Sequence, residues 1–343
     1  MIKTYQYRLK DSSSKHLLNF LAGKVNYVFN YCNEASLLKF KESRKFLTEK
    51  ELILLTTGSS KSLGLYASTI QNVVKEFCLR KLKAKKYKLH WRISKGTRKN
   101  LGWIPVTNQA IKVENSTLTF AGNTFKFWKS REIEGKIKSA SFSENSKGQW
   151  FINLICEYEP EPTPINIHSV GIDLGLKTLV TLSTGETIEN PRFLKHHEEA
   201  LAKAQRAKHK KQARNIHLKI KNSRKDFLHK ETTRLVNKFG IFFVGNVSSK
   251  QMIKKRNFSK SISDAGWYLF KTLLEYKVIA LGRVFKEINE KYSSCTCSVC
   301  SAKTGPSGLG QLGVRNWICS NCNTPHNRDV NAAVNILNFG LGH

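Results

Sequence analysis

The sequence lacks any long, uninterrupted apolar run. Its longest apolar stretches, such as Ile241–Val244, are far shorter than the roughly 20 residues that a helix needs to cross a bilayer. The first ten residues, Met1–Lys10, contain no hydrophobic stretch of the secretory kind. These absences argue against an integral membrane protein and against a secreted one. We therefore expect a soluble, intracellular protein.

Acidic residues are also scarce. The 343 residues include 58 Lys and Arg but only 25 Asp and Glu, which gives a formal net charge of +33 at pH 7. Such a charge repels itself and favours a polyanionic partner, above all nucleic acid, because each neutralised phosphate releases condensed counterions. An anionic membrane surface is a weaker alternative, since the basic segments lack matching stripes of Trp, Phe and Leu. Apolar residues make up 40% of the chain, which excludes wholesale disorder.

Two segments hold basic residues and no acid. Residues 80–99 contain ten Lys and Arg, with Tyr87 and Trp91 among them, and residues 203–225 contain ten more. A solvated helix face usually mixes charges of both signs, so a single-sign segment predicts a track for phosphate groups. The two rings could stack on bases or, in the case of Trp91, pack in a core. The residues that we expect to bind nucleic acid are Lys83, Lys85, Lys86, Lys88, Arg92, Arg206, Lys210, Lys211, Arg214 and Arg328.

The eight cysteines are unevenly placed. Cys32, Cys78 and Cys156 are isolated, whereas the other five lie within residues 295–322. Two CxxC pairs separated by 18 residues have the ligand type and spacing of a tetrahedral zinc site, and two unrelated redox motifs would not explain their closeness. Cys295 is a spare thiol in this interpretation, and His326 is a weak alternative ligand. The predicted structural zinc ligands are Cys297, Cys300, Cys319 and Cys322.

The hydrophobic pattern predicts a multidomain α+β protein. A strand over residues 1–9 is followed by helices over 14–41 and 42–89, and short strands from 103 to 159 are typical of a small barrel. Three prolines at 160, 162 and 164 indicate a linker. Beyond them strands and helices alternate. The pattern predicts strands at 169–174, 241–246 and 284–290, a hairpin at 178–188, and helices at 191–238, 264–281 and 329–339.

Two aspartates stand where a metal could be held. Asp173 ends the apolar strand 169–174 and is followed by Gly175, and Asp329 lies at the start of the last predicted helix. Carboxylate oxygen is the ligand that Mg²⁺ prefers. Alternatively, Asp173 could cap a turn or belong to an actin-like ATP-binding fold, and Asp329 could cap its helix. The occurrence of both motifs around a four-cysteine insert favours the metal interpretation.

Several segments resemble one known family. They are MIKTY at the start, NYCN at 30–33, VGIDLGLKTLVTLSTGETIENPRF at 170–193, SKSISDAGW at 259–267, the two CxxC pairs, and HNRDVNAA at 326–333. Together they are similar to the TnpB proteins, transposon-encoded, RNA-guided DNA endonucleases related to the type V CRISPR effectors. The resemblance runs over nearly the whole chain and is densest from Val170 to Leu337.

The resemblance implies a domain plan, cofactors and partners. It implies a wedge β-barrel from residues 1–12 and 101–160, interrupted by a helical recognition insert at 13–100. A RuvC nuclease domain of ribonuclease H-like fold would follow at 161–292 and 324–343, with a zinc ribbon inserted at 293–323. The implied cofactors are structural Zn²⁺, catalytic Mg²⁺ and a guide RNA, and the implied partner is double-stranded target DNA. The implied reaction is hydrolysis of a phosphodiester bond with two metal ions.

The sequence departs from the family at one catalytic position. The second RuvC motif usually carries a Glu at a strand end, where this chain has Gly245 and Asn246. Glu290 ends the strand expected to lie beside it, about 4.8 Å away, and Gly245 leaves room for its carboxylate. A branch of the family has a similarly relocated glutamate, and Glu287 is a poorer candidate because it faces the other side of its strand. We therefore predict Asp173, Glu290 and Asp329 as catalytic, magnesium-binding residues, with Arg328 near the scissile phosphate.

Two other functions stay open. The replacement of the usual Glu by Gly245 also suits an RNA-guided DNA-binding protein without nuclease activity, such as a repressor. A self-sufficient transposase is disfavoured, because no Tyr–His transposase motif is present.

Overall fold

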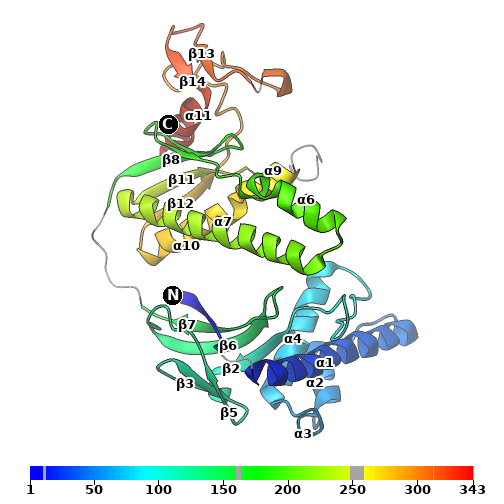
Figure 1. Cartoon of the computed structure of the whole chain (residues 1–343). Helices are drawn as coiled ribbons and strands as arrows, with labels where there is room; N and C mark the ends of the chain where they lie inside the picture. Colours follow the sequence, from blue (N-terminus) through cyan, green and yellow to red (C-terminus); the bar gives the residue numbers. More distant parts are fainter. Residues whose placement is uncertain (11–12, 160–163, 165, 248–258, 312, 343) are drawn as a thin grey trace. The chain divides into compact units, whose positions relative to one another are not determined.

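The computed structural model describes residues 1–10, 13–159, 164, 166–247, 259–311 and 313–342. They form two compact units, Met1–Glu159 and Pro160–His343, and each unit has its own hydrophobic core (Figure 1). Within the described ranges, no helix is both long enough and apolar enough to cross a membrane. The predicted proline linker lies outside the described residues, apart from Pro164.

The first unit contains two antiparallel sheets. Four strands pair in the order β1 (Ile2–Arg8), β7 (Trp150–Glu157), β6 (Lys136–Glu144) and β2 (Trp103–Thr107). The second sheet contains β3 (Ile111–Glu114), β4 (Thr117–Phe120) and β5 (Asn123–Lys126). An isolated β-bridge between Leu9 and Phe127 joins the two sheets.

The expectation of a closed barrel in this unit is not met among the described strands. Strands β3, β4 and β5 have only four residues each, and each pairs with its neighbour in sequence along its whole length. They therefore form a separate small sheet and do not close the ring between β1 and β2. The strands themselves lie where the alternating pattern predicts them.

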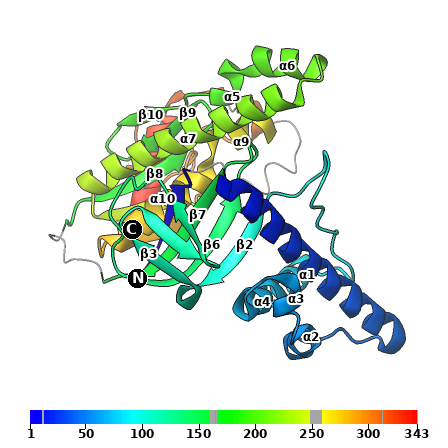
Figure 2. The same ribbon diagram turned by 60° about the horizontal axis from the view of Figure 1, so that its bottom comes forward.

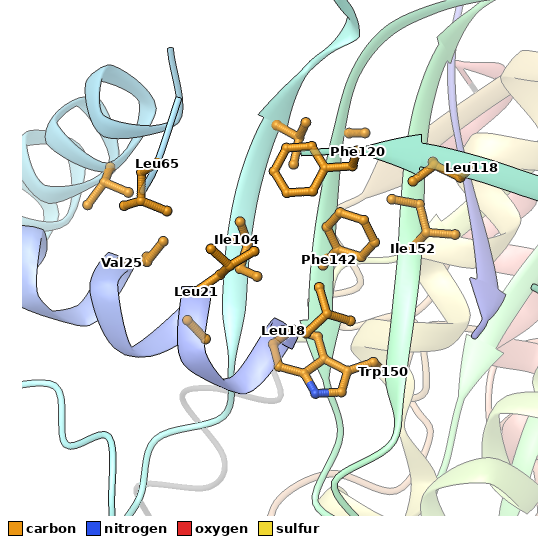
Figure 3. Packing of buried hydrophobic residues seen from close by; sticks show 14 of the residues in the cluster. Leu18, Leu21, Val25, Leu65, Ile104, Leu118, Phe120, Phe142, Trp150 and Ile152 are labelled. Carbon is orange, nitrogen blue, oxygen red and sulfur yellow. The ribbon is translucent and has the colours of Figure 1, made fainter. Parts of the chain in front are cut away.

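Helices complete the first core. They are α1 (Ser13–Ser43), α2 (Glu49–Thr56), α3 (Ser60–Leu63) and α4 (Ala67–Ala84). Figure 3 shows Leu21 of α1 beside Ile104 of β2 and Leu18 of α1 beside Trp150 of β7, in a cluster that also contains Phe142. The helical region predicted to reach residue 89 ends at Ala84, because Lys85 adopts a left-handed φ of 51°.

The second unit is built on a five-stranded sheet. Its order is β10 (Thr187–Glu189), β9 (Thr178–Leu182), β8 (Ser169–Leu174), β11 (Ile241–Gly245) and β12 (Val284–Ile288). β8, β11 and β12 run parallel, and β9 and β10 continue the sheet as an antiparallel hairpin. Gly245 pairs with Ile288, so the prediction that these two strands are neighbours is confirmed.

Helices cover both faces of this sheet. Val170, Ile172 and Val244 share a core with residues of α7 (Lys210–Lys238) and α10 (Trp267–Ala280). Phe243 and Ile288 point the other way and pack against Ile336 of α11 (Arg328–Leu341). Figure 1 shows α11 on the opposite side of the sheet from α7 and α10.

Two predicted helices are broken by turns. The basic region 191–238 forms α5 (Phe193–His196), α6 (Glu198–Arg206) and α7, with α6 folded back beside α7 (Figure 2). The region predicted as one helix at 264–281 is interrupted at Gly266, which separates α9 (Ser259–Ala265) from α10. Gly266 has a φ of +68°, a left-handed conformation that a continuous α-helix does not contain. The cysteine-rich insert between β12 and α11 forms a small hairpin of β13 (Asn316–Ile318) and β14 (Pro325–Asn327).

Helix α11 approaches strand β8 very closely at Gly171. A Cβ at this position would overlap the carbonyl oxygen of Ala333 and would lie 2.7 Å from the backbone nitrogen of Leu337. A side chain here would therefore push α11 away from the sheet.

We predict that Gly171→Ala destabilises the protein by about 1–3 kcal/mol, the usual cost of overpacking a core. The midpoint of thermal unfolding should fall by at least about 2 °C in calorimetry. Gly310→Ala is the matched control, because a Cβ there meets nothing within 4 Å. Equal midpoints for the two variants would contradict this account of the packing.

Candidate functional site

The four cysteines of the two CxxC pairs come together in the insert. Their sulfur atoms all lie within 4.8 Å of one another, with 3.6 Å between Cys297 and Cys322 and 3.5 Å between Cys300 and Cys319. Four sulfurs around a tetrahedral zinc ion would be separated by about 3.8 Å. The predicted cluster is confirmed, and it can hold a metal ion such as zinc.

The surroundings of this cluster suit metal binding. The hydroxyl of Thr304 lies 3.2 Å from Cys319 Sγ and donates to it, which lowers the pKa of the thiol to about 6 and favours the thiolate that binds metals. Burial raises the pKa of Cys297 to about 11, so metal binding would displace a proton there. His326 Nε2 lies 3.0 Å from Cys297 Sγ, and the Cys295 thiol bonds to the carbonyl of Tyr292. Cys295 and His326 therefore flank the four-sulfur group without being part of it.

The side of the sheet on which Asp173 and Glu290 lie follows from three residues that face α11. Gly171 of β8, Phe243 of β11 and Ile288 of β12 all contact or closely approach α11. Side chains two residues apart on a strand point to the same face. The positions two residues further along are Asp173, Gly245 and Glu290, which therefore lie on the α11 side at the ends of three adjacent parallel strands.

The Glu290 carboxylate fills the space left by the missing side chain at Gly245. A Cβ on Gly245 would overlap Oε2 of Glu290 and would lie 3.2 Å from Cδ1 of Ile336. Oε2 is buried and has no hydrogen-bond partner among the described residues. Burial raises the pKa of Glu290, and the backbone N–H of Val247 and the charge of Lys271 oppose the increase. Glu287 points elsewhere and pairs with Lys271 at 2.8 Å.

Asp173 lies within the electrostatic reach of both other acids. Burial, together with the negative charges of Glu290 and Asp329, raises its pKa to about 7. Arg315 and Arg328 act in the opposite direction. A multivalent cation would offset the repulsion that the charges of Glu290 and Asp329 exert on Asp173.

The third acid is held by an arginine that the sequence did not single out. Asp329 lies in the first turn of α11, and Nη1 of Arg315 donates to both of its carboxylate oxygens at 2.6 and 2.9 Å. The cap of α11 is the neighbouring Asn327, whose side chain accepts from the backbone N–H groups of Asp329 and Val330. Asp329 is therefore not the cap of its helix, which was the alternative interpretation. No sequence signal marks Arg315, since it follows a glycine-rich loop without any regular spacing.

Two asparagines of α11 fasten the insert to the sheet domain. The side-chain amides of Asn331 and Asn335 are buried, and each donates to the carbonyls of Ser293 and Thr296. Asn327, Asn331 and Asn335 recur every fourth residue, and this spacing could have indicated the polar contact in advance. Arg328 is buried and donates to the carbonyl of Gln311 at 2.7 Å, so its guanidinium faces the insert.

The first basic segment is held in place by asparagines of α1. Asn33 and Asn30 each exchange two hydrogen bonds with the backbone, of Leu89 and Arg92 respectively, at 2.8–3.1 Å. Lys83, Lys85 and Lys86 are exposed, and Lys88 is half-buried and pairs with Glu34 at 3.9 Å. Burial lowers the pKa of the half-buried Arg92, whose guanidinium lies over Phe29 and Trp103. Tyr87 and Trp91 are exposed, at 63% and 48%.

The second basic segment lies on α6 and α7. Arg206, Lys210, Lys211 and Arg214 are all exposed, at the end of α6 and in the first turns of α7. They belong to the second unit, whereas the lysines of residues 83–88 belong to the first. Each unit therefore displays basic side chains of its own.

Comparison with known proteins identifies the family. A family model described as the Cas12f1-like TNB domain matches residues 267–336, and the OrfB_IS605 model, described as "Probable transposase", matches residues 153–256. A Streptomyces pristinaespiralis protein named "Putative RNA-guided DNA endonuclease" is 33% identical over 370 residues, covering 99% of this chain and 89% of its own. An Escherichia coli K12 protein with the same name and the suffix InsQ is 29% identical over 244 residues, covering 63% and 60%. The solved structures include a chain from a cryo-EM structure of a Cas12f1–sgRNA–target DNA complex, and the match to it covers 98% of this chain and 99% of that chain, with 18% identity and a TM-score of 0.41.

The Streptomyces relative matches nearly the whole chain at 33% identity. This protein belongs to the TnpB family, as the motifs at 170–193, 259–267 and 326–333 predicted.

We predict that Cys297→Ser lowers both the zinc content and the midpoint of thermal unfolding. The energy of binding a structural metal is part of the folding energy, so the two losses should occur together. Zinc is measured by elemental analysis and stability by calorimetry. Cys295→Ser is the matched control, because its thiol is buried in the same insert but lies outside the four-sulfur group. A wild-type protein with well under one zinc ion per chain would contradict the prediction.

Proposed function

We propose that this TnpB protein is a transposon-associated, RNA-guided DNA endonuclease. The observation that carries the proposal is the position of the Glu290 carboxylate, in the space beside Gly245 and on the sheet face shared with Asp173 and Asp329. The names of the Streptomyces and Escherichia relatives support the guided cleavage of DNA.

In this proposal residues 161–292 and 324–343 form the nuclease domain, of the ribonuclease H-like type. Support comes from the five-stranded sheet, in which an antiparallel hairpin is followed by two further parallel strands. Residues 293–323 are the zinc ribbon. Residues 1–12 and 101–160 form the wedge, and residues 13–100 form the recognition insert.

The carboxylates fit a pair of Mg²⁺ ions. A buried oxygen of Glu290 without a hydrogen-bond partner among the described residues is an available ligand atom, and a cation would offset the repulsion that raises the pKa of Asp173. When bound, such ions activate a water molecule and stabilise the leaving 3′ oxygen of a phosphodiester.

The side chains of the site have separate tasks in this proposal. Asp173, Glu290 and Asp329 would hold the cations. Arg315 donates to both oxygens of Asp329 and keeps that carboxylate oriented before metal and DNA arrive. The half-buried position of Asp173 leaves part of the site open to a substrate.

Guide RNA and target DNA are the proposed partners. The net charge of +33 and the exposed lysines and arginines of residues 83–88 and 206–214 support binding to phosphate backbones. In such complexes, base pairing supplies the sequence specificity, and the protein holds the paired strands by their backbone and shape.

A nuclease-inactive, RNA-guided DNA-binding protein is the second candidate function, because Gly245 occupies the position of the usual catalytic Glu. The experiment that separates the two uses protein co-expressed with its flanking genomic RNA and a plasmid library of target sites. An endonuclease cuts some of the plasmids, whereas a repressor only shifts their mobility. Nuclease-treated protein should lose guided binding and regain it with the cognate RNA.

We predict that Glu290→Gln abolishes plasmid cutting and leaves guided DNA binding within about twofold of wild type. The substitution keeps the shape of the side chain but removes the negative charge that the metal ions need. Asp173→Ala and Asp329→Ala should also abolish cutting. Glu287→Gln is the matched control and should cut, since it removes only the ion pair between the exposed Glu287 carboxylate and Lys271. Equal cutting by Glu290→Gln and wild type would show that the relocated glutamate is not used.

We predict a separate effect for Gly245→Ala. The added methyl group would overlap Oε2 of Glu290, so the carboxylate must leave its present position. Cutting should fall at least about tenfold, in line with the sensitivity of catalysis to displacements of about 1 Å. The calorimetric midpoint shows whether folding is intact, and Gly310→Ala is again the control. A fully active Gly245→Ala would mean that the Glu290 carboxylate is not needed beside Gly245.

A further inference from the structure

The second unit contains a cavity that the proposed catalytic site does not use. Its volume is about 370 Å³. Its walls are the turn between β8 and β9, the segment after β10, and helix α9. The polar residues that line it are Lys177, Asn190, Arg192, Lys195, Ser261 and Asp264.

The cavity is strongly basic. Lys177, Arg192 and Lys195 are exposed, and none of them takes part in an ion pair among the described residues. The one acid that lines the cavity, Asp264, is buried, and its negative charge is already paired within the protein. Its carboxylate accepts the backbone N–H of Leu194 at 3.0 and 3.1 Å and Nη2 of Arg224 at 2.6 Å. Three positive charges are thus available to a ligand, and the carboxylate that could offset them is engaged elsewhere.

The walls of the cavity are fixed by hydrogen bonds. Nε1 of Trp267 donates to the carbonyl of Gly175 at 3.1 Å, and Nδ2 of Asn190 donates to the carbonyl of Leu176 at 3.0 Å. Oδ1 of Asn190 accepts the backbone N–H of Arg192 at 3.1 Å. One asparagine therefore ties the β8–β9 turn to the segment that carries Arg192 and Lys195. A site held in this way keeps its shape without a ligand, which lowers the cost of binding one.

The cavity lies near the carboxylates of the second unit. Lys177 follows Asp173 by four residues, so their Cα atoms are separated by at most about 14 Å. Phosphates along one strand of a duplex rise by about 3.4 Å per nucleotide. A strand whose scissile phosphate lay at Asp173 would therefore bring a phosphate to Lys177 within roughly four nucleotides of that bond.

We propose that Lys177, Arg192 and Lys195 form a binding pocket for a backbone phosphate of the DNA strand that is cut. The inference rests on the proposed function and adds to it a residue set that fixes the register of the strand in the nuclease site. The DNA strand is favoured over the guide RNA because the same short turn connects the pocket to Asp173.

The test replaces the phosphates of the DNA strand, one at a time, by linkages without charge. One phosphate at a time in the cleaved DNA strand is replaced by an uncharged methylphosphonate, and the affinity of the protein–RNA complex for each DNA is measured in buffer without Mg²⁺. The variants are wild type, Lys177→Ala/Lys195→Ala, and Lys147→Ala/Lys286→Ala. The last is the matched control, because its two lysines are exposed and lie outside the pocket.

The proposal predicts one or two sensitive positions within about four nucleotides of the cut. There the neutral linkage should weaken binding by wild type and by the control roughly threefold to fivefold, the effect of a partly exposed charge pair. The pocket variant should bind unmodified DNA more weakly than wild type, and the neutral linkage should weaken its binding no further. The lysine substitutions and the neutral linkage would remove the same lysine–phosphate interaction, so their effects should not add.

Three results would overturn the proposal. The scan could be flat near the cut, the two lysine pairs could behave alike and show only a general effect of charge, or the sensitive positions could lie in the guide RNA when it is scanned in the same way. The assay measures binding in the absence of Mg²⁺ and does not depend on cutting. A complex that binds its target but never cuts would therefore overturn the proposed endonuclease activity, and the scan would still test the phosphate pocket. A failure of guided binding itself would overturn both.

Discussion

The pairing of β11 with β12 determines how the acids of the second unit are arranged. The parallel register places Gly245 opposite Ile288, so that Glu290, two residues later, turns its carboxylate into the volume that a side chain at Gly245 would occupy. The same alternation places Asp173 on this face. Oε2 of Glu290 is buried without a hydrogen-bond partner among the described residues, and burying a polar atom in this way is costly. That cost is tolerable if a cation completes the site, and the arrangement therefore supports the proposed metal-dependent cleavage.

Helix α11 connects this carboxylate group to the cysteine cluster. Its first turn carries Asp329, its middle lies directly on Gly171, and its buried Asn331 and Asn335 hold the backbone at the base of the insert. Arg315, which belongs to the insert, binds Asp329 in return. A metal ion bound by the four cysteines would thus stabilise a loop that positions Asp329, the proposed third metal-binding acid, and the effect of losing the ion should extend beyond the insert itself.

Much of this could be predicted from the sequence, because the decisive signals are local. Strand alternation gave the sheet of the second unit to within two residues, the CxxC spacing gave the cysteine cluster, and the family resemblance pointed from Gly245 to Glu290. The pairing of strands that are distant in sequence leaves no local pattern, and in the first unit it could not be predicted. The strands there form two sheets instead of one closed barrel. Arg315 and the pocket around Arg192 depend on loops whose contacts carry no periodic pattern, so only the structure reveals them.

The central claim is that Glu290, and not a residue of the β11 strand end, completes a metal site with Asp173 and Asp329. The most direct measurement is anomalous diffraction from crystals of the protein soaked in Mn²⁺, which substitutes for Mg²⁺ at oxygen ligands. The account predicts an anomalous peak within bonding distance of carboxylate oxygens of both Asp173 and Glu290, with Arg315 displaced from at least one oxygen of Asp329. A peak held by Asp173 and Asp329 while Glu290 stays unbound beside Gly245, or no peak at these acids, would contradict it.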